Sequence, residues 1–320
     1  MINKVISLLE SASSVAIYTH INTDCDAMGS SLALKEVLEQ KGKEVDVFAN
    51  SAFPNNFSFF GDLSFVNQKN NKSKYDLVVC LDAAGEGRLG KYKYTYRKNT
   101  KNTLNIDHHI TNERFCKTNF VKSASSTCEI LFDILCAMKI TFTKTICKYL
   151  ISGIATDTGK FSHSATQKTF TIVSKLLRFG GLKMEEITGP LFNSMTTQVF
   201  ELLQRAYSQI EFFADKKLAL IMFSRKDFEE TKTTLDDVDV FPDIPLQLEK
   251  VEFAILASED DKGYFRVSLR SKGEISAREV AESFGGGGHL NASGCKIFGE
   301  FNEVKEKLIS NTLEIMGWKR

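Results

Sequence analysis

Three short apolar stretches of this sequence each run directly into a histidine or an aspartate. These junctions are Val15–Thr19 before His20, Leu77–Leu81 before Asp82, and Thr103–Ile106 before Asp107. Each stretch has the length and apolar content of a strand buried in a parallel sheet. In open parallel α/β sheets, ligands bind outside the carboxyl ends of the strands, so the three polar residues are expected to meet at one edge of one sheet.

The residues between and after these stretches alternate between helical and extended patterns. After Gly29, leucine and valine recur at helical spacing as far as Gly42, and Glu44–Phe48 has the pattern of the next strand, which gives a β–α–β opening. Further helices are predicted at residues 126–138, 143–159, 167–179, 198–207, 276–283 and 301–316, and further strands at residues 209–213, 218–223, 251–257 and 264–269. This order predicts an α/β fold.

The length of 320 residues favours two domains. The helical pattern weakens around Gly189–Pro190, so a linker is predicted at residues 187–197. It separates an N-terminal domain with a parallel sheet, residues 1–186, from a smaller α/β domain, residues 198–320. Residues 231–245 are acidic, hold two of the four prolines and are expected to form a loop.

The composition limits the partners of the chain. Its 41 basic and 40 acidic residues give a net charge of +1, whereas proteins that grip long nucleic acid carry a clear basic excess. Small or short anionic ligands are therefore favoured. No apolar run approaches the roughly 20 residues that span a membrane, and the N-terminus lacks the apolar core of a secretory signal. Seven cysteines without a CxxC pair indicate reduced thiols and a cytoplasmic location. The sequence leaves open whether the chain forms a homodimer.

Six side chains near the predicted strand and helix ends are candidate metal ligands: His20, Asp24, Asp26, Asp82, His108 and Asp157. If the backbone of Asp24–Asp26 is extended, both carboxylates face one side and Cys25 faces the other, where it packs as a small hydrophobe. Asp157 taken alone is better explained as a helix cap. The glycines beside it, Gly153 and Gly159, would let it approach a site.

Four carboxylates and two imidazoles carry too much charge for one ion. Such a set suits two divalent cations that share a bridging carboxylate. Mixed oxygen and nitrogen ligation suits Mn²⁺, with Mg²⁺ and Fe²⁺ as alternatives, whereas a structural zinc site would use cysteine. Because paired cations polarise a phosphoryl oxygen and activate water, the predicted reaction is hydrolytic attack on phosphorus.

A second candidate site lies in the C-terminal half. A glycine run, Gly286, Gly287 and Gly288, is followed by His289, and the backbone N–H groups of such glycines can bind an anion. Arg270, directly after a predicted strand, offers a guanidinium that can bind phosphate through two hydrogen bonds. A flexible glycine linker is the alternative, but a linker is not expected to end in histidine between a helix and a turn.

With these motifs the sequence resembles the DHH phosphoesterases that carry a C-terminal DHH-associated domain, in particular the nanoRNase/pAp phosphatase-like members. The motifs are His20-x-x-x-Asp24-x-Asp26, Asp82, Asp107-His108-His109, Asp157 and Gly286-Gly287-Gly288-His289, and the resemblance covers nearly the whole chain. Many relatives have proline where this chain has Thr23. That position shapes a loop and is not a ligand.

The resemblance implies a role for each of these residues. One cation would be held by His20, Asp24 and Asp82, and the other by Asp26, Asp82, His108 and Asp157, with Asp82 bridging the two. Asp107 would orient His108, and His109 would act beside the scissile phosphate. Arg270, His289 and the glycine run would bind the substrate, and the active site would lie in the cleft between the domains. Ser125–Thr127 would either line the site or cap the helix that follows.

The implied activity is that of a metal-dependent phosphodiesterase and phosphatase. An oligoribonuclease of this kind hydrolyses short RNA from one end and also removes the 3′-phosphate of pAp. A cytosolic cyclic di-AMP/pApA phosphodiesterase is the alternative, and the ligand set does not separate the two. An inorganic pyrophosphatase is disfavoured because the glycine run indicates nucleotide-sized substrates. A non-catalytic nucleotide-binding module would be expected to lack ligands, and none is missing.

Overall fold

The computed structural model describes residues 1–50, 59–68, 74–98, 101–193, 195–238 and 241–320. It divides into two compact units, residues 1–194 and 195–320. Each unit has its own sheet, which confirms the predicted α/β class with two domains. Among the helices that the structure describes, none is both long and apolar enough to cross a lipid bilayer.

The first unit is built on a five-stranded parallel sheet with the order β2-β1-β3-β4-β5. In chain order the strands are β1 (Ser14–Tyr18), β2 (Glu44–Phe48), β3 (Leu77–Leu81), β4 (Thr103–Asp107) and β5 (Thr118–Val121). After β2 the chain crosses to the other side of β1, so the direction of winding reverses between β1 and β3. Crevices for ligands form at such switch points. The four predicted strands are confirmed, and β5 was not predicted.

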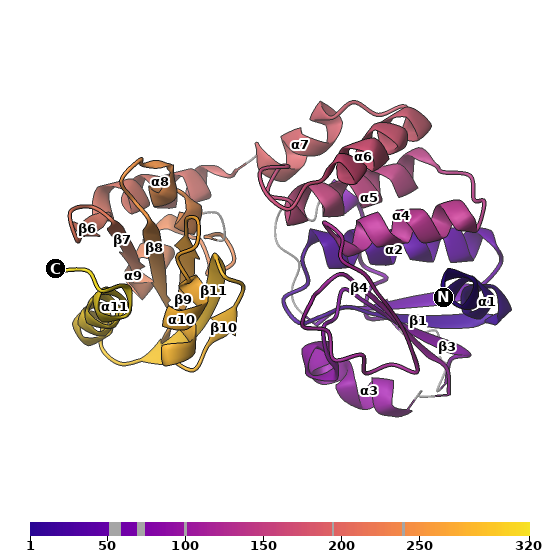
Figure 1. Ribbon diagram of the computed structural model, residues 1–320, viewed down its shortest axis with the longest axis horizontal. Coiled ribbons are helices and arrows are strands. Elements are labelled where there is room, and N and C mark those ends of the chain that lie inside the picture. The colour runs from indigo at the N-terminus through magenta and orange to yellow at the C-terminus, as the bar shows by residue number, and fades with distance from the viewer. Residues whose placement is uncertain (51–58, 69–73, 99–100, 194, 239–240) are drawn as a thin grey trace. The chain divides into compact units, whose positions relative to one another are not determined.

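Helices cover both faces of this sheet (Figure 1). In β1, Val15 and Ile17 enter one buried cluster, whereas Ala16 and Tyr18 enter another on the opposite face, as the two-residue repeat of a strand requires. The first cluster contains residues of α1 (Ile2–Ser11), α2 (Cys25–Gln40), α4 (Thr127–Ala137), α5 (Lys144–Asp157) and α6 (Gln167–Gly180). The second contains residues of the 3₁₀-helix η2 (Glu86–Tyr92) and of α3 (Lys93–Lys98).

The first half of the predicted linker, residues 187–192, is helical. Helix α7 (Glu185–Phe192) spans Gly189–Pro190, and its Ile187 and Leu191 are buried in the core of the first unit. Pro190 has no N–H to donate to Glu186 O four residues earlier, so it weakens this helix, which ends two residues later. The first unit therefore extends past residue 186, and of the predicted linker Ser194 lies outside the described residues.

The second unit contains a six-stranded sheet with the order β10-β11-β9-β8-β7-β6, in which the β7–β8 pair is parallel and the other pairs are antiparallel. The strands are β6 (Glu211–Phe213), β7 (Leu218–Phe223), β8 (Phe253–Glu259), β9 (Tyr264–Ser271), β10 (Gly287–Gly288) and β11 (Ala292–Phe298).

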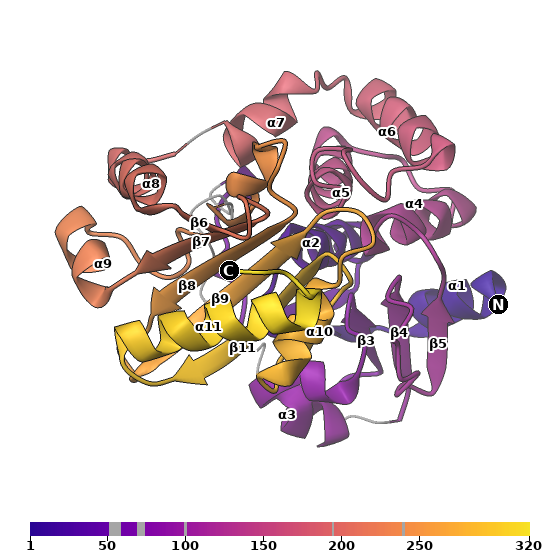
Figure 2. The ribbon, with the colours of Figure 1, turned by 60° about the vertical axis from the view of Figure 1, so that its left-hand side comes forward.

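Helices α8 (Thr197–Gln209) and α9 (Arg225–Thr231) cover one face of this sheet. Helices α10 (Ala277–Ser283) and α11 (Phe301–Met316) cover the other (Figure 2). Strand β10, which lies in the glycine run, and strand β11, which follows it, were not predicted. In the predicted acidic loop, residues 239–240 lie outside the described residues, and 3₁₀-helix η3 (Phe241–Asp243) follows them.

A buried carboxylate fixes α4 against α6. Glu129 of α4 is 2% exposed and accepts hydrogen bonds from the hydroxyls of Ser125, at 2.6 Å, and Thr169 of α6, at 2.8 Å. Lys168 Nζ lies 3.3 Å from its other oxygen. Burial alone would raise the pKa of Glu129, but these donors lower it below its usual value. The ionised form therefore stabilises the fold.

We expect Glu129→Gln to lower the stability of the first unit by about 1–3 kcal/mol at neutral pH, because the hydroxyls of Ser125 and Thr169 lose an ionised acceptor. Since the pKa of Glu129 is depressed in the folded chain, the difference from wild type should be complete above pH ~4.5 and shrink as the pH falls below it. Thermal unfolding of both proteins at several pH values measures this. A difference that stays constant down to pH 3 would contradict the assigned network.

Candidate metal centre

The candidate ligands of the first unit gather at the carboxyl ends of β1, β3 and β4. His20 follows β1, Asp82 follows β3, and Asp107 ends β4. These are three adjacent strands beside the switch point of the sheet. Their polar residues meet at one edge of the sheet, as predicted from the sequence. Asp82 adopts a left-handed backbone conformation, with φ of 56°, and its N–H donates to Ile106 O at 3.0 Å. Aspartate tolerates this conformation better than most residues.

One group of ligand atoms consists of His20, Asp24 and Asp82, which lie within 4.8 Å of one another. His20 Nε2 lies 3.3 Å from Asp82 Oδ2 and 3.5 Å from Asp24 Oδ2. The other ring nitrogen, Nδ1, lies 2.6 Å from Ile21 O. A proton on Nδ1 donates to that carbonyl and leaves Nε2 as the ligand atom, the arrangement that metal-binding histidines usually have.

A second group consists of Asp26, His108 and Asp157. His108 Nε2 lies 3.3 Å from Asp157 Oδ2 and 3.5 Å from Asp82 Oδ1. Asp82 thus turns one oxygen toward His20 and the other toward His108. A carboxylate between two imidazoles in this way has the geometry of a bridging ligand between two cation sites. The donors are oxygen and imidazole nitrogen, a set that fits Mn²⁺, Mg²⁺ or Fe²⁺.

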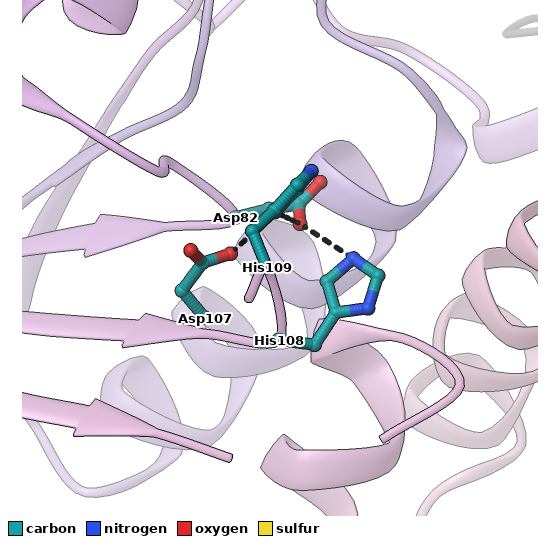
Figure 3. A group of neighbouring side chains, drawn as sticks. All are labelled: Asp82, Asp107, His108 and His109. Atoms are coloured by element: carbon teal, nitrogen blue, oxygen red, sulfur yellow. Dashed lines mark hydrogen bonds and ion pairs between the residues drawn. The ribbon is translucent and has the colours of Figure 1, made fainter. Parts of the chain in front are cut away.

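The structure corrects the predicted role of Asp107. Its Oδ1 lies 2.8 Å from Nδ1 of His109, not of His108 (Figure 3). Its Oδ2 accepts from Asn112 Nδ2 at 2.5 Å. Nδ1 of His108 instead faces Ala124 O at 3.3 Å. Asp107 is completely buried. It therefore orients His109, because the backbone at the end of β4 turns the two histidines to different neighbours. Asn112 was not singled out from the sequence.

The extended backbone considered for Asp24–Asp26 holds only at Asp24, because helix α2 begins at Cys25. Asp24 is the N-cap of α2, and its Oδ1 accepts from Asp26 N and Ala27 N, both at 3.0 Å. Asp26 lies in the first helical turn. Both carboxylates still reach the ligand groups, because Asp24 Oδ2 remains directed at His20. Cys25 is 3% exposed and belongs to the apolar core, as predicted.

The carboxylates of the centre repel one another. Burial and the charge of Asp82 raise the pKa of Asp26 to about 7, and burial with the charges of Asp26 and Asp82 raises the pKa of Asp157 to about 10. Asp157 is also the last residue of α5, where the helix dipole disfavours a negative charge. It is not the cap of the next helix, because Thr166 caps α6.

Burial alone would lower the pKa of His20, but Asp24 and Asp82 raise it well above its usual value. Divalent cations would offset this excess of negative charge.

Ser125–Thr127 was expected either to line the site or to cap the following helix, and different residues of the segment do each. Ser126 caps α4, because its hydroxyl accepts from Glu129 N at 3.1 Å. Thr127 faces the centre, where its hydroxyl donates to Asp82 Oδ1 at 3.0 Å. A cap signal was visible in the sequence, but the long-range partner of Thr127 was not.

The second unit places its candidate residues at one end of its sheet. Arg270 of β9 lies opposite Ala292 of β11 in the strand register, and His289 stands in the turn before β11. Ser293 Oγ donates to His289 O at 2.7 Å. In the glycine run, Gly286 N already donates to Ala281 O within the unit, and His289 N donates to Ala292 O. The glycine run therefore has fewer N–H groups for an anion than its composition indicates.

Comparison with known proteins identifies the family. Residues 14–154 match the N-terminal domain of the DHH family. Residues 216–314 match the DHHA1 domain. The chain belongs to the DHH family.

A probable bifunctional oligoribonuclease and PAP phosphatase NrnA of Streptococcus mutans is 27% identical over 301 residues, which cover 92% of this chain and 93% of that protein. The bifunctional oligoribonuclease and PAP phosphatase NrnA of Thermus thermophilus is 27% identical over 305 residues, covering 94% of this chain and 89% of the relative. Among solved structures, an exopolyphosphatase-related protein from Bacteroides fragilis superimposes with a TM-score of 0.91 at 28% identity, over 98% of this chain and 95% of that one.

Gly153 of α5 has no room for a side chain. A Cβ atom there would lie 2.4 Å from Cys128 Sγ and 2.8 Å from Asp26 Oδ1. We expect Gly153→Ala to displace the Asp26 carboxylate and to weaken Mn²⁺ binding about 10–100-fold, as loss of the groups that orient ligands does. Calorimetric titration with Mn²⁺ measures this.

Gly189→Ala is the matched control, because Gly189 also lies in a helix of the first unit and its Cβ would meet no heavy atom within 4 Å. It should bind Mn²⁺ as wild type does. Equal affinity in the two variants would contradict the close approach of α5 to Asp26.

Proposed function

We propose that this chain is a phosphoesterase with two divalent cations that hydrolyses RNA oligonucleotides of a few residues and removes the 3′-phosphate of pAp. The observation that carries the proposal is the position of Asp82, whose two carboxylate oxygens face imidazoles 3.3 Å and 3.5 Å away on opposite sides. The names of the Streptococcus and Thermus relatives support the substrate class.

The cations are held by the two ligand groups. His20, Asp24 and Asp82 would hold one, and Asp26, Asp82, His108 and Asp157 the other; Mn²⁺ is the proposed ion, with Mg²⁺ and Fe²⁺ as alternatives. When bound, such a pair polarises a phosphoryl oxygen and lowers the pKa of water. Because the ligand atoms are carboxylate oxygens and imidazole nitrogens, the centre would bind its cations more weakly as the pH falls.

His109 is the proposed general acid. Asp107 holds its Nδ1 at 2.8 Å, which fixes the orientation of the imidazole ring beside the centre. Burial alone would lower the pKa of His109, but the hydrogen bond to Asp107 and the charge of Asp82 raise it. A protonated His109 can give its proton to the leaving oxygen. Asn112 keeps Asp107 in place through the bond to its second oxygen.

The second unit would bind the phosphate groups of the substrate. Arg270 offers a guanidinium, whose present partners are Asp243 at 3.4 Å and Leu269 O at 3.1 Å. A phosphate would bind such a side chain more strongly than this exposed carboxylate does. His289 and Gly286–Gly288 would add donors beside it. All seven cysteines are free, which supports a cytoplasmic location for the enzyme.

Asp82→Asn tests the bridging carboxylate. The amide keeps the shape of the side chain but provides one oxygen instead of two, so hydrolysis and Mn²⁺ binding should each fall more than about 100-fold, beyond the effect of losing an outer partner. Asp46→Asn is the control, since Asp46 is also a buried aspartate of the first unit, at 6% exposure, and bonds to Tyr75 away from the centre. Retained hydrolysis in Asp82→Asn would refute the two-cation proposal.

A substrate panel tests the proposed specificity. With Mn²⁺, we expect turnover of pAp and of RNA of two to five nucleotides, and much slower turnover of RNA of about 20 nucleotides, because the chain lacks the basic excess that holds long polyanions. Release of phosphate and nucleotides is measured by chromatography. Faster hydrolysis of cyclic di-AMP or pApA than of pAp would replace the proposal with a dinucleotide phosphodiesterase, and preference for pyrophosphate would refute both.

A further inference from the structure

Two carboxylates of the metal centre accept hydrogen bonds from the first turn of α4. Asp26 Oδ2 accepts from the backbone N–H of Thr127 at 2.6 Å, and Oδ1 accepts from that of Cys128 at 2.9 Å. The hydroxyl of Thr127 donates to Asp82 Oδ1 at 3.0 Å. Asp26 and Asp82 lie 101 and 45 residues away along the chain from Thr127. Thr127 therefore contacts both Asp82, the bridging candidate, and Asp26, a ligand of the second group.

The hydroxyl of Thr127 has no competing acceptor from its own helix. Threonine inside a helix usually donates to a carbonyl three or four residues earlier. Thr127 is the first residue of α4, so no helical turn precedes it. The Thr127 hydroxyl is the donor in its hydrogen bond to Asp82 Oδ1, so its proton points at Asp82.

Neighbouring contacts fix the position of Thr127. Ser126 caps α4, and Ser125 donates to Glu129 in the first turn of the same helix. Ser126 and Thr127 are completely buried. The first turn of α4 is thus held in place, and the hydroxyl of Thr127 presents a fixed donor to the centre.

That donor acts on the oxygen of Asp82 that faces His108. Without it, the Asp82 carboxylate could rotate away from Asp26 and Asp157, which repel it. The hydrogen bond opposes this rotation and keeps Oδ2 directed at His20 and Oδ1 directed at His108. Outer partners of this kind commonly change metal affinity about 10–100-fold when they are lost.

We infer that Thr127 is a positioning residue whose hydroxyl holds the Asp82 carboxylate between the two ligand groups and thereby sets the affinity of the centre for divalent cations. The inference rests on the proposed function, because it concerns the same centre. Thr127 does not contact the substrate in this role, and its effect passes through Asp82.

Three variants of the full chain test this role. Thr127→Val removes the donor and keeps the shape of the side chain, whereas Thr127→Ser keeps the donor. Thr169→Val removes an equally buried hydroxyl that bonds to Glu129 and not to the centre. The Mn²⁺ affinity of each is measured by calorimetric titration, together with the thermal midpoint without the ion and with kcat and KM for pAp.

We expect Thr127→Val to bind Mn²⁺ about 10–100-fold more weakly than wild type. Its kcat should fall by a larger factor than its KM changes. Thr127→Ser should recover most of the affinity. Thr169→Val should unfold at a lower temperature but bind Mn²⁺ as wild type does. If Thr127→Val does not fold, Thr127→Ala, which also lacks the donor, takes its place in the comparison.

Wild-type affinity in Thr127→Val, or an equal loss in Thr127→Val and Thr169→Val, would overturn the inference. Failure of the proposed function has a different signature. In that case the wild-type chain binds Mn²⁺ but hydrolyses none of the phosphate esters, while the difference in affinity between Thr127→Val and Thr127→Ser remains.

Discussion

The mutual repulsion of buried carboxylates at one edge of a sheet is the constraint on which the first unit depends. Asp26, Asp82 and Asp107 are each at most 2% exposed, and Asp157 stands at the unfavourable end of α5. Taking such charges out of water costs several kcal/mol per ion unless partners compensate. The fold places donors around them: the N-terminus of α4, the hydroxyl of Thr127 and the amide of Asn112. These donors are too few to neutralise the charge, and the remaining deficit is the physical reason to expect cations.

The packing of the helices follows from the same requirement. Helix α5 must approach α2 closely enough for Asp157 to reach the centre, and glycines permit this approach: a Cβ on Gly29 would lie 2.5 Å from Tyr149 O, and one on Gly153 would lie 2.8 Å from Asp26 Oδ1. The position of α4 is set in turn by Glu129 and its partners on α6. Thr169, which contacts no ligand, thus serves the packing of α6 on α4.

Much of this arrangement could be predicted from the sequence, because strand ends and their polar residues are local signals. The carboxyl ends of β1, β3 and β4 required no long-range information beyond the rule that parallel strands end at the same edge. The errors occurred where local and tertiary preferences compete. Asp24 satisfies the N-terminus of α2 and a ligand group at once, so its cap role changed the expected backbone. Asp107 has two histidines beside it, and the chain alone does not say which one it contacts. Strand β11 was missed because its first residues belong to a glycine-rich segment, where strand propensity is low.

The long-range hydrogen bonds explain why the remaining features could not be read from sequence spacing. The N–H groups of Thr127 and Cys128 are obligatory donors at any helix N-terminus, and in most helices a cap or water satisfies them. Here Asp26, from another helix, does so. The same contact that satisfies α4 therefore orients a ligand, and the stability of α4 and the geometry of the centre become one property. Cations that bind to the folded centre and not to the unfolded chain would stabilise the first unit by mass action. Part of the cost of burying the carboxylates is then recovered when the centre binds its ions.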